Sequence, residues 1–155
     1  RSSAASDVYK RQILHDVVED CVRDSMTREM LEERIGHKFG NSVLATVLMV
    51  THRKVDDDGI ELSSEDKKED YLARLSLANE DALWVCAADK VHNAHTVLSD
   101  LRRTAFPETV WGRFSVGREG TVRWYRRVAN RLREVGFNAP IVDELEAAAS
   151  ALEQV

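Results

Sequence analysis

The sequence predicts an all-α protein, and three observations lead to this fold class. Only two of the 155 residues are proline and seven are glycine, so few residues interrupt a helix. Apolar residues recur at steps of three and four along most of the chain. No stretch of useful length alternates apolar and polar residues as a half-buried strand does.

The first part of the chain is expected to form three helices. The apolar pattern of the first begins at Ile13. Thr27 is a suitable N-cap for the second, because its hydroxyl can accept a hydrogen bond from a free backbone N–H of the first turn. Gly36 and Gly40 interrupt the pattern, and a third helix follows over residues 43–51.

The middle of the chain is expected to contain a loop and two helices. Residues 56–70 hold eight acidic side chains, which predicts a solvated loop that leads into a helix. Ser63 and Ser64 are the candidate caps of that helix. Asn79 can cap a long helix whose apolar residues extend over 83–101.

The last third of the chain has clear signals for helix ends. Pro107 marks the end of the long helix or the start of a new one. Apolar residues then recur over 124–135. Gly136 stands where a glycine commonly follows a helix, and Pro140 is placed to open the final helix.

Composition and charge exclude several classes of protein. Hydrophobic residues make up 43% of the chain and charged residues 32%, which excludes disorder and collagen-like repeats. The formal net charge of −5 makes nucleic acid an unexpected partner. No apolar run approaches the ~20 residues that a membrane span needs. Cys21 and Cys86 are too few for a disulfide framework, so we expect two buried thiols and a cytoplasmic location.

The N-terminal residues do not fit the pattern of the rest. Residues 1–12 (RSSAASDVYKRQ) are small, polar and without periodicity. They resemble the translated read-through of a sequencing adapter, and an ordinary frayed terminus is the alternative. We expect residues 1–12 to be non-native or flexible, with the natural N-terminus missing, and residues 13–155 to form a single helical domain.

One segment places four polar groups on a helix whose other residues are apolar. In LHDVVED (residues 14–20), His15 lies one turn from Glu19, and Asp16 lies one turn from both Glu19 and Asp20. Three carboxylates on one face repel each other unless a cation is present, and histidine with aspartate suits a first-row divalent metal. The alternative is a solvated acidic face with a structural histidine, and this segment alone leaves both open.

A second polar group lies in the most apolar of the expected helices. Asp89 and Asn93 share a helix face at a spacing of four residues. A carboxylate in a core helix is costly unless it is paired or binds a metal. The alternative to a metal is a salt bridge, to Lys90 or to an arginine.

Together these segments resemble the HD superfamily of metal-dependent phosphohydrolases, whose ligands are a histidine, a His-Asp doublet and a distant aspartate. The closer resemblance is to guanosine tetra- and pentaphosphate hydrolases of the RelA/SpoT type and their small stand-alone bacterial relatives. It covers about residues 13–134 and includes a stretch at 111–125. Its two motifs are HDxxED and D-[RK]-x-H-N, which match His15, Asp16, Glu19 and Asp20, and then Asp89, Lys90, His92 and Asn93.

The resemblance implies a role for each matched residue. Glu19 and Asp20 orient or deprotonate the attacking water, and Asn93 holds the nucleotide sugar or the water network. The metal is expected to be Mn²⁺ or another divalent first-row ion, and its ligands are His15, Asp16 and Asp89.

The chain departs from the family at the first ligand. That histidine lies on a helix well upstream of the doublet, whereas the fourteen residues before His15 contain none. We therefore expect the first family helix to be missing, and the fragment either to be catalytically impaired or to use another group. His52 and His92 are the candidates, although each is expected to lie beside the site or on the surface.

The arginines are concentrated in one segment. Residues 101–135 hold nine arginines and three glutamates, a local charge of +6 in a chain of net charge −5. This segment is either a rim that attracts an anionic nucleotide or a solvated helix face. Arg113 and Arg118, next to glycine-containing turns, are the expected substrate-binding pair.

The sequence therefore predicts a Mn²⁺-dependent phosphohydrolase whose partner is a small nucleotide. The expected reaction releases the 3′-pyrophosphate of guanosine tetra- or pentaphosphate through a metal-activated water. An HD phosphohydrolase for another nucleotide or phosphoester, and a non-catalytic nucleotide-binding HD module, are the alternatives. A third alternative, a nucleic-acid-binding helical domain, is supported only by the arginine-rich segment. The sequence does not indicate the oligomeric state.

Overall fold

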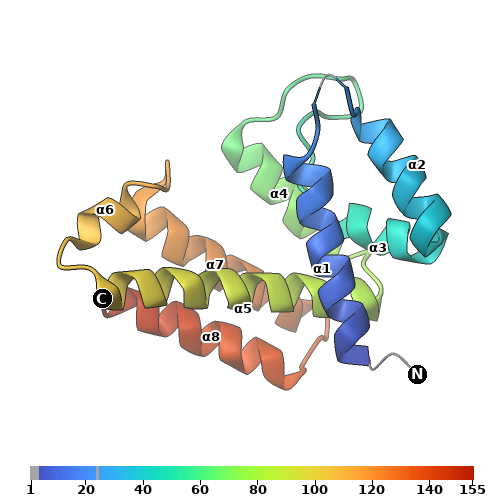
Figure 1. Ribbon diagram of the computed structural model, residues 1–155. Helices are drawn as coiled ribbons and strands as arrows, with labels where there is room; N and C mark the ends of the chain where they lie inside the picture. Colours follow the sequence, from blue (N-terminus) through green and yellow to red (C-terminus); the bar gives the residue numbers. More distant parts are fainter. Residues whose placement is uncertain (1–3, 24) are drawn as a thin grey trace. The chain divides into compact units, whose positions relative to one another are not determined.

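The computed structural model describes residues 4–23 and 25–155, with side chains from Lys10 onward. The described residues form eight helices and no strand, which confirms the all-α class (Figure 1). The helices are α1 (Ala4–Asp20), α2 (Arg28–Phe39), α3 (Asn41–Val50), α4 (Ser64–Leu75), α5 (Glu80–Arg103), α6 (Pro107–Trp111), α7 (Gly117–Glu134) and α8 (Pro140–Glu153). None of these described helices is long and apolar enough to cross a bilayer.

The chain divides into two compact units, residues 1–86 and residues 87–155. Helix α5 begins in the first unit and ends in the second. The expected single domain over residues 13–155 stays a prediction.

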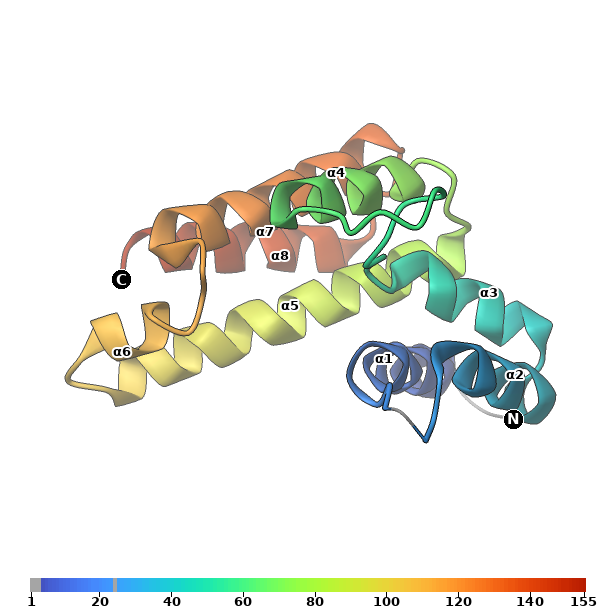
Figure 2. The same cartoon turned by 90° about the horizontal axis from the view of Figure 1, so that it is seen from above.

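In the first unit, α1 packs against α2 and α3, and α3 also packs against α2 and α4 (Figure 2). Val18 of α1, Ile35 of α2 and Val47 of α3 form a buried apolar cluster between these helices. Removing such side chains from water is the main source of their stabilisation, at about 1.5–3 kcal/mol for each fully buried side chain. This cluster holds the face of α1 that carries Val18, so that the polar residues of α1 have defined positions.

Side-chain caps begin three of the helices, as predicted. Thr27, Ser63 and Asn79 each accept a hydrogen bond from the backbone N–H three residues later, at 3.3, 3.1 and 2.9 Å. Gly40 separates α2 from α3 with a φ of 91°, a conformation that favours glycine. Gly36 lies inside α2 and does not end it.

Replacing Ser63 by alanine is expected to lower the free energy of unfolding by about 1 kcal/mol, because the N–H of Asp66 loses its acceptor. Urea denaturation followed by circular dichroism measures this change. Ser64, the first residue of α4, is the matched control, and its replacement by alanine is expected to change stability by only a few tenths of a kcal/mol. Equal losses in the two variants would show that the cap contributes nothing.

In the second unit, α7 packs against α8. Val128 and Leu132 of α7 and Leu145 and Leu152 of α8 are completely buried. Helix α7 ends as predicted: Gly136 has a φ of 83°, and the next N–H bonds back to the carbonyl oxygen of Leu132 at 2.9 Å. Pro107 and Pro140 open α6 and α8, as their sequence positions predict.

Two details differ from the sequence predictions. Helix α1 begins at Ala4, well before the apolar pattern that starts at Ile13, because extending an existing helix costs little for residues that tolerate helical geometry. The first three residues lie outside the described part, and the non-native origin of residues 1–12 stays a prediction. Cys21 is exposed, because α1 ends one residue before it, whereas Cys86 is buried as expected.

Candidate metal centre

The imidazole of His15 is buried, with 3% of the residue exposed, and one of its nitrogens is fixed by the backbone of α1. Its Nδ1 lies 2.5 Å from the carbonyl oxygen of Gln12. Since a carbonyl oxygen only accepts, Nδ1 carries the proton and donates it. If Nε2 carries no proton, its lone pair is available, which is the arrangement found in metal-binding histidines.

Asp16 places a carboxylate oxygen beside that lone pair. Its Oδ1 lies 3.3 Å from Nε2 of His15, and its side chain is 59% exposed. A neutral Nε2 and a carboxylate oxygen are both acceptors, so their approach is unfavourable unless a proton or a metal cation joins them. The pair therefore offers one nitrogen and one oxygen to a cation, from two consecutive residues.

The C-terminal end of α1 is unfavourable for the charges that it carries. Asp16, Glu19 and Asp20 lie in or next to the last turn, where the helix dipole favours cations, and this turn contains no basic residue. Asp20 is the final residue of the helix and is exposed. A cation at this helix end would reduce the repulsion between these carboxylates.

Glu19 is held by a residue far away in the sequence. Its Oε1 accepts a hydrogen bond of 2.7 Å from the backbone N–H of His52, just after α3. A bond to a charged acceptor is stronger than one between neutral groups, so this contact fixes the carboxylate. The backbone around His52 is itself fixed, since the guanidinium of Arg74 donates to the carbonyl oxygens of Leu48, Met49 and Thr51 at 2.8–3.0 Å.

Glu19 also lines a cavity of about 300 Å³ in the first unit. Basic residues line it too: Arg28 pairs with Glu32 at 2.7 Å, and Arg53 pairs with Asp57 at 2.5 Å. Lys54 is exposed, and no described carboxylate pairs with it. Sequence reasoning missed these residues, although the run His52–Lys54 directly after an apolar helix was a visible signal.

Asp89 lies in the second unit and is 5% exposed. Its Oδ2 is 2.6 Å from Nζ of Lys90, which is equally buried, and its Oδ1 accepts from the amide of Asn93 at 3.2 Å. The salt bridge considered as an alternative to a metal is therefore present. A carboxylate oxygen can accept more than one contact, so this pairing leaves Asp89 able to act as a ligand.

The charges of Asp89 and Lys90 also affect the pKa of Tyr125 in α7. Burial raises the pKa of Tyr125 to about 12, the charge of Lys90 lowers this pKa and that of Asp89 raises it. Its phenol therefore stays protonated at neutral pH. Within the second unit, the Asp89–Lys90 pair and Tyr125 form one buried polar group.

The predicted substrate-binding arginines have partners in the second unit. Arg113 forms an ion pair with Asp100 at 2.7 Å, and Arg118 donates to the carbonyl oxygen of Glu153 at 2.7 Å. Their substrate-binding role, and that of Asn93, stays a prediction.

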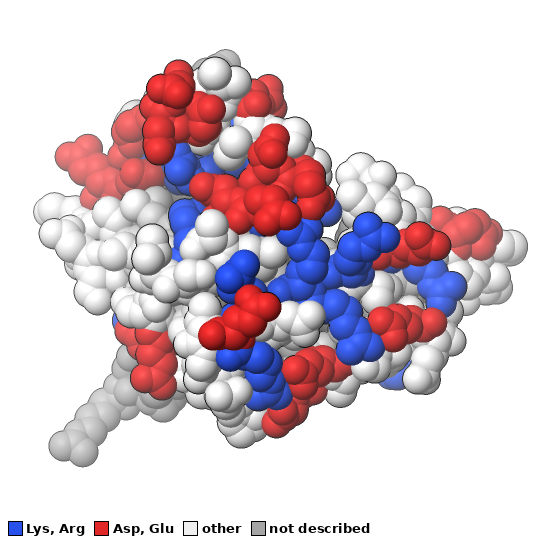
Figure 3. Space-filling view, turned by 180° about the vertical axis from the view of Figure 1, so that it is seen from behind, with Lys and Arg blue, Asp and Glu red and all other residues white. Residues whose placement is uncertain are grey.

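Most other arginines of α7 also form ion pairs with carboxylates. Arg126 pairs with Glu153 at 2.8 Å, and the hydrogen bonds that Arg133 donates to Glu146 and Asp143 raise the pKa of its guanidinium. Figure 3 shows acidic and basic side chains next to one another on one face. These pairs favour the solvated helix face over a continuous nucleotide-attracting rim.

The two alternative histidine ligands have different surroundings. The ring of His52 is stacked on Tyr71, with 4.5 Å between ring centroids and 17° between planes. His92 is exposed on α5. Neither observation assigns a ligand role to His52 or His92, so their candidacy stays a prediction.

Comparison with known proteins supports a shared fold but does not indicate an activity. No family model and no curated protein matches the chain. The crystal structure of lmo0812 from Listeria monocytogenes EGD-e is similar, with a TM-score of 0.74 and 23% sequence identity. The match covers 96% of this chain and 89% of the Listeria chain. At this identity the likeness shows a shared fold alone.

Proposed function

We propose that this protein is a metal-dependent phosphohydrolase in which His15, Asp16 and Asp89 bind one divalent cation. The observation that carries the proposal is the pair formed by His15 and Asp16, with Nδ1–H donated to a carbonyl and Nε2 facing a carboxylate oxygen. A nitrogen donor with carboxylate oxygens suits Mn²⁺ and neighbouring first-row ions. The acidic end of α1, which has no basic residue, supports the same assignment.

The reaction is the hydrolysis of a phosphoester or pyrophosphoryl ester of a nucleotide. A divalent cation supplies an acidified water and neutralises phosphate charge. Glu19, fixed by the N–H of His52, and Asp20 are the groups that orient this water and accept its proton. The water oxygen forms a bond to phosphorus, the bond from phosphorus to the ribose oxygen breaks, and the ribose oxygen takes a proton.

The substrate proposed first is guanosine tetra- or pentaphosphate, with loss of the 3′-pyrophosphate. This choice rests on the resemblance of residues 15–20 and 89–93 to the RelA/SpoT-type hydrolases. Another nucleotide or phosphoester is the alternative within the same class. The basic residues around Glu19, with Lys54 unpaired among the described residues, support an anionic substrate of either kind.

One observation favours a second candidate function, a non-catalytic nucleotide-binding module. The ammonium group of Lys90 neutralises Asp89, which weakens that carboxylate as a metal ligand. A module of this kind would bind a nucleotide equally well with and without metal, and would release no product.

The test is an assay of pyrophosphate release from guanosine tetraphosphate by this protein. Release that requires Mn²⁺ and stops with a chelator is expected. Release that continues in the chelator contradicts the metal-dependent mechanism. Metal-independent binding without release indicates the second candidate.

Replacing Glu19 by glutamine is expected to lower kcat by about 10²-fold or more, because the amide keeps the contact with His52 but cannot take a proton from water. The affinity for Mn²⁺, measured by calorimetry, is expected to change little. Glu33→Gln on α2, an exposed acidic side chain of the same unit, is the control and should retain full activity. A kcat within twofold of the parent for Glu19→Gln would remove Glu19 from the mechanism.

A further inference from the structure

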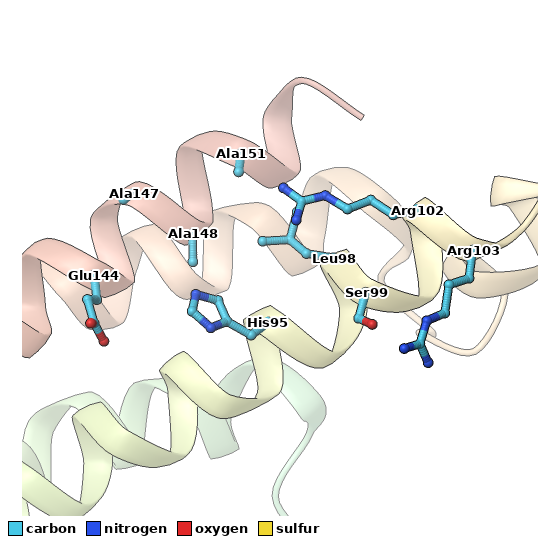
Figure 4. A pocket seen from close by; sticks show the side chains of 9 residues that line it. All are labelled: His95, Leu98, Ser99, Arg102, Arg103, Glu144, Ala147, Ala148 and Ala151. Carbon is cyan, nitrogen blue, oxygen red and sulfur yellow. The ribbon is translucent and has the colours of Figure 1, made fainter.

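A groove in the second unit contains polar side chains that the proposed metal centre does not use. It has a volume of about 550 Å³ and lies between α5 and α8 (Figure 4). Clefts of about 300–1,000 Å³ are the usual size for small-molecule sites. Most of its polar lining comes from one face of α5, since His95, Ser99, Arg102 and Arg103 recur at helical spacing, and Glu144 of α8 is the other polar lining residue.

These four side chains differ from most arginines of the second unit. The arginines at positions 113, 118, 126, 131 and 133 each contact a carboxylate or a carbonyl oxygen. Within the described part of the chain, Arg102 and Arg103 have no such partner, and the side chains of His95 and Ser99 make no hydrogen bond. The helix dipole explains cations in the last turn of α5 but not a histidine and a serine in the turns before it.

The remaining lining gives the groove an apolar floor and an acidic end. Leu98 and Ala148 are 5% and 3% exposed and form the floor. Figure 4 shows the guanidinium of Arg102 extending toward Ala151 of α8, with the ring of His95 between it and Glu144. One end of the groove is therefore cationic and the other anionic.

We propose that this groove binds a small organic phosphomonoester of nucleotide size. Arg102 holds the phosphate, because the planar guanidinium donates two parallel hydrogen bonds to phosphate oxygens. Figure 4 shows the guanidinium of Arg103 pointing away from that of Arg102, so Arg103 joins the site through a change of its side-chain rotamer. Ser99 and His95 donate to the same group or to its ester oxygen. The organic body covers Leu98 and Ala148, and Glu144 accepts a hydrogen bond from an amino or hydroxyl group at the far end.

The test is a titration of ¹⁵N-labelled protein with adenosine 5′-monophosphate, inorganic phosphate and adenosine, in a chelator so that no metal centre contributes. The nucleotide is expected to shift the amide resonances of Ser99 and Ala148 and to bind at least tenfold more tightly than phosphate or adenosine. This preference separates an organic phosphomonoester from a site for free phosphate. No shift at millimolar nucleotide, or equal affinity for phosphate alone, would overturn the proposal.

A double variant tests whether Arg102 and Arg103 bind the nucleotide. Arg102→Gln with Arg103→Gln is expected to weaken nucleotide binding at least tenfold, with an unchanged circular dichroism spectrum. Arg123→Gln on α7 is the matched control, since Arg123 is also exposed and, among the described residues, has no ion-pair partner. Unchanged affinity in the double variant, or an equal loss in the control, would show that the two arginines form no specific site.

Discussion

Replacing Asp89 by asparagine is expected to lower metal-dependent phosphohydrolysis at least a hundredfold. Asparagine keeps the size of the side chain and can still accept from the amide of Asn93, which lies 3.2 Å from Oδ1 of Asp89. It removes the negative charge that the metal requires from this ligand. The expected result is a loss of Mn²⁺ affinity in calorimetry together with the loss of kcat.

The control for this experiment is Asp100→Asn. Asp100 lies on the same helix and also forms an ion pair, with Arg113 at 2.7 Å, but it belongs to neither half of the proposed metal centre. Its replacement is expected to leave metal affinity and rate within twofold of the parent. A parent-like rate for Asp89→Asn would exclude Asp89 as a ligand.

The same substitution is expected to destabilise the fold by about 3–5 kcal/mol, because it removes the carboxylate that pairs with the buried ammonium of Lys90. The side chains of Asp89 and Lys90 are only 6% and 7% exposed, so water screens this charge weakly. Urea denaturation of the metal-free protein measures the loss.

A double variant separates this structural effect from the catalytic one. Asp89→Asn with Lys90→Met removes both charges and is expected to recover most of the stability, since replacing a whole buried ion pair is often close to neutral. Activity is expected to stay lost in the double variant. Recovery of activity with stability would mean that Asp89 acts only through the fold.

Short-range features were predictable from the sequence, because their causes lie within one helical turn. The caps at Thr27, Ser63 and Asn79 each bond to an N–H three residues later, and Gly136 takes the positive φ that glycine tolerates. The His15–Asp16 pair also follows from one helical segment. The Asp89–Lys90 salt bridge was one of two interpretations, and the sequence did not decide between them.

Long-range partners were not predictable in the same way. Nothing near Glu19 in the sequence indicates that the N–H of His52 holds it, or that Arg74 holds the backbone next to His52. The sequence left two interpretations of the arginines of α7, a cationic rim and a solvated helix face, and acidic partners on α8 such as Glu153 and Glu146 favour the helix face. These contacts depend on how separate helices pack, which local periodicity does not encode.

The most direct test of the account is a substoichiometric Mn²⁺ titration of the ¹⁵N-labelled chain, because Mn²⁺ broadens the resonances of nearby nuclei. If the three residues share one metal centre, the amide resonances of His15, Asp16 and Asp89 broaden together at the first additions. The amide resonances of the acidic loop at 56–58 stay sharp. Broadening at His15 and Asp16 without Asp89, or first at residues 56–58, would contradict a shared metal centre.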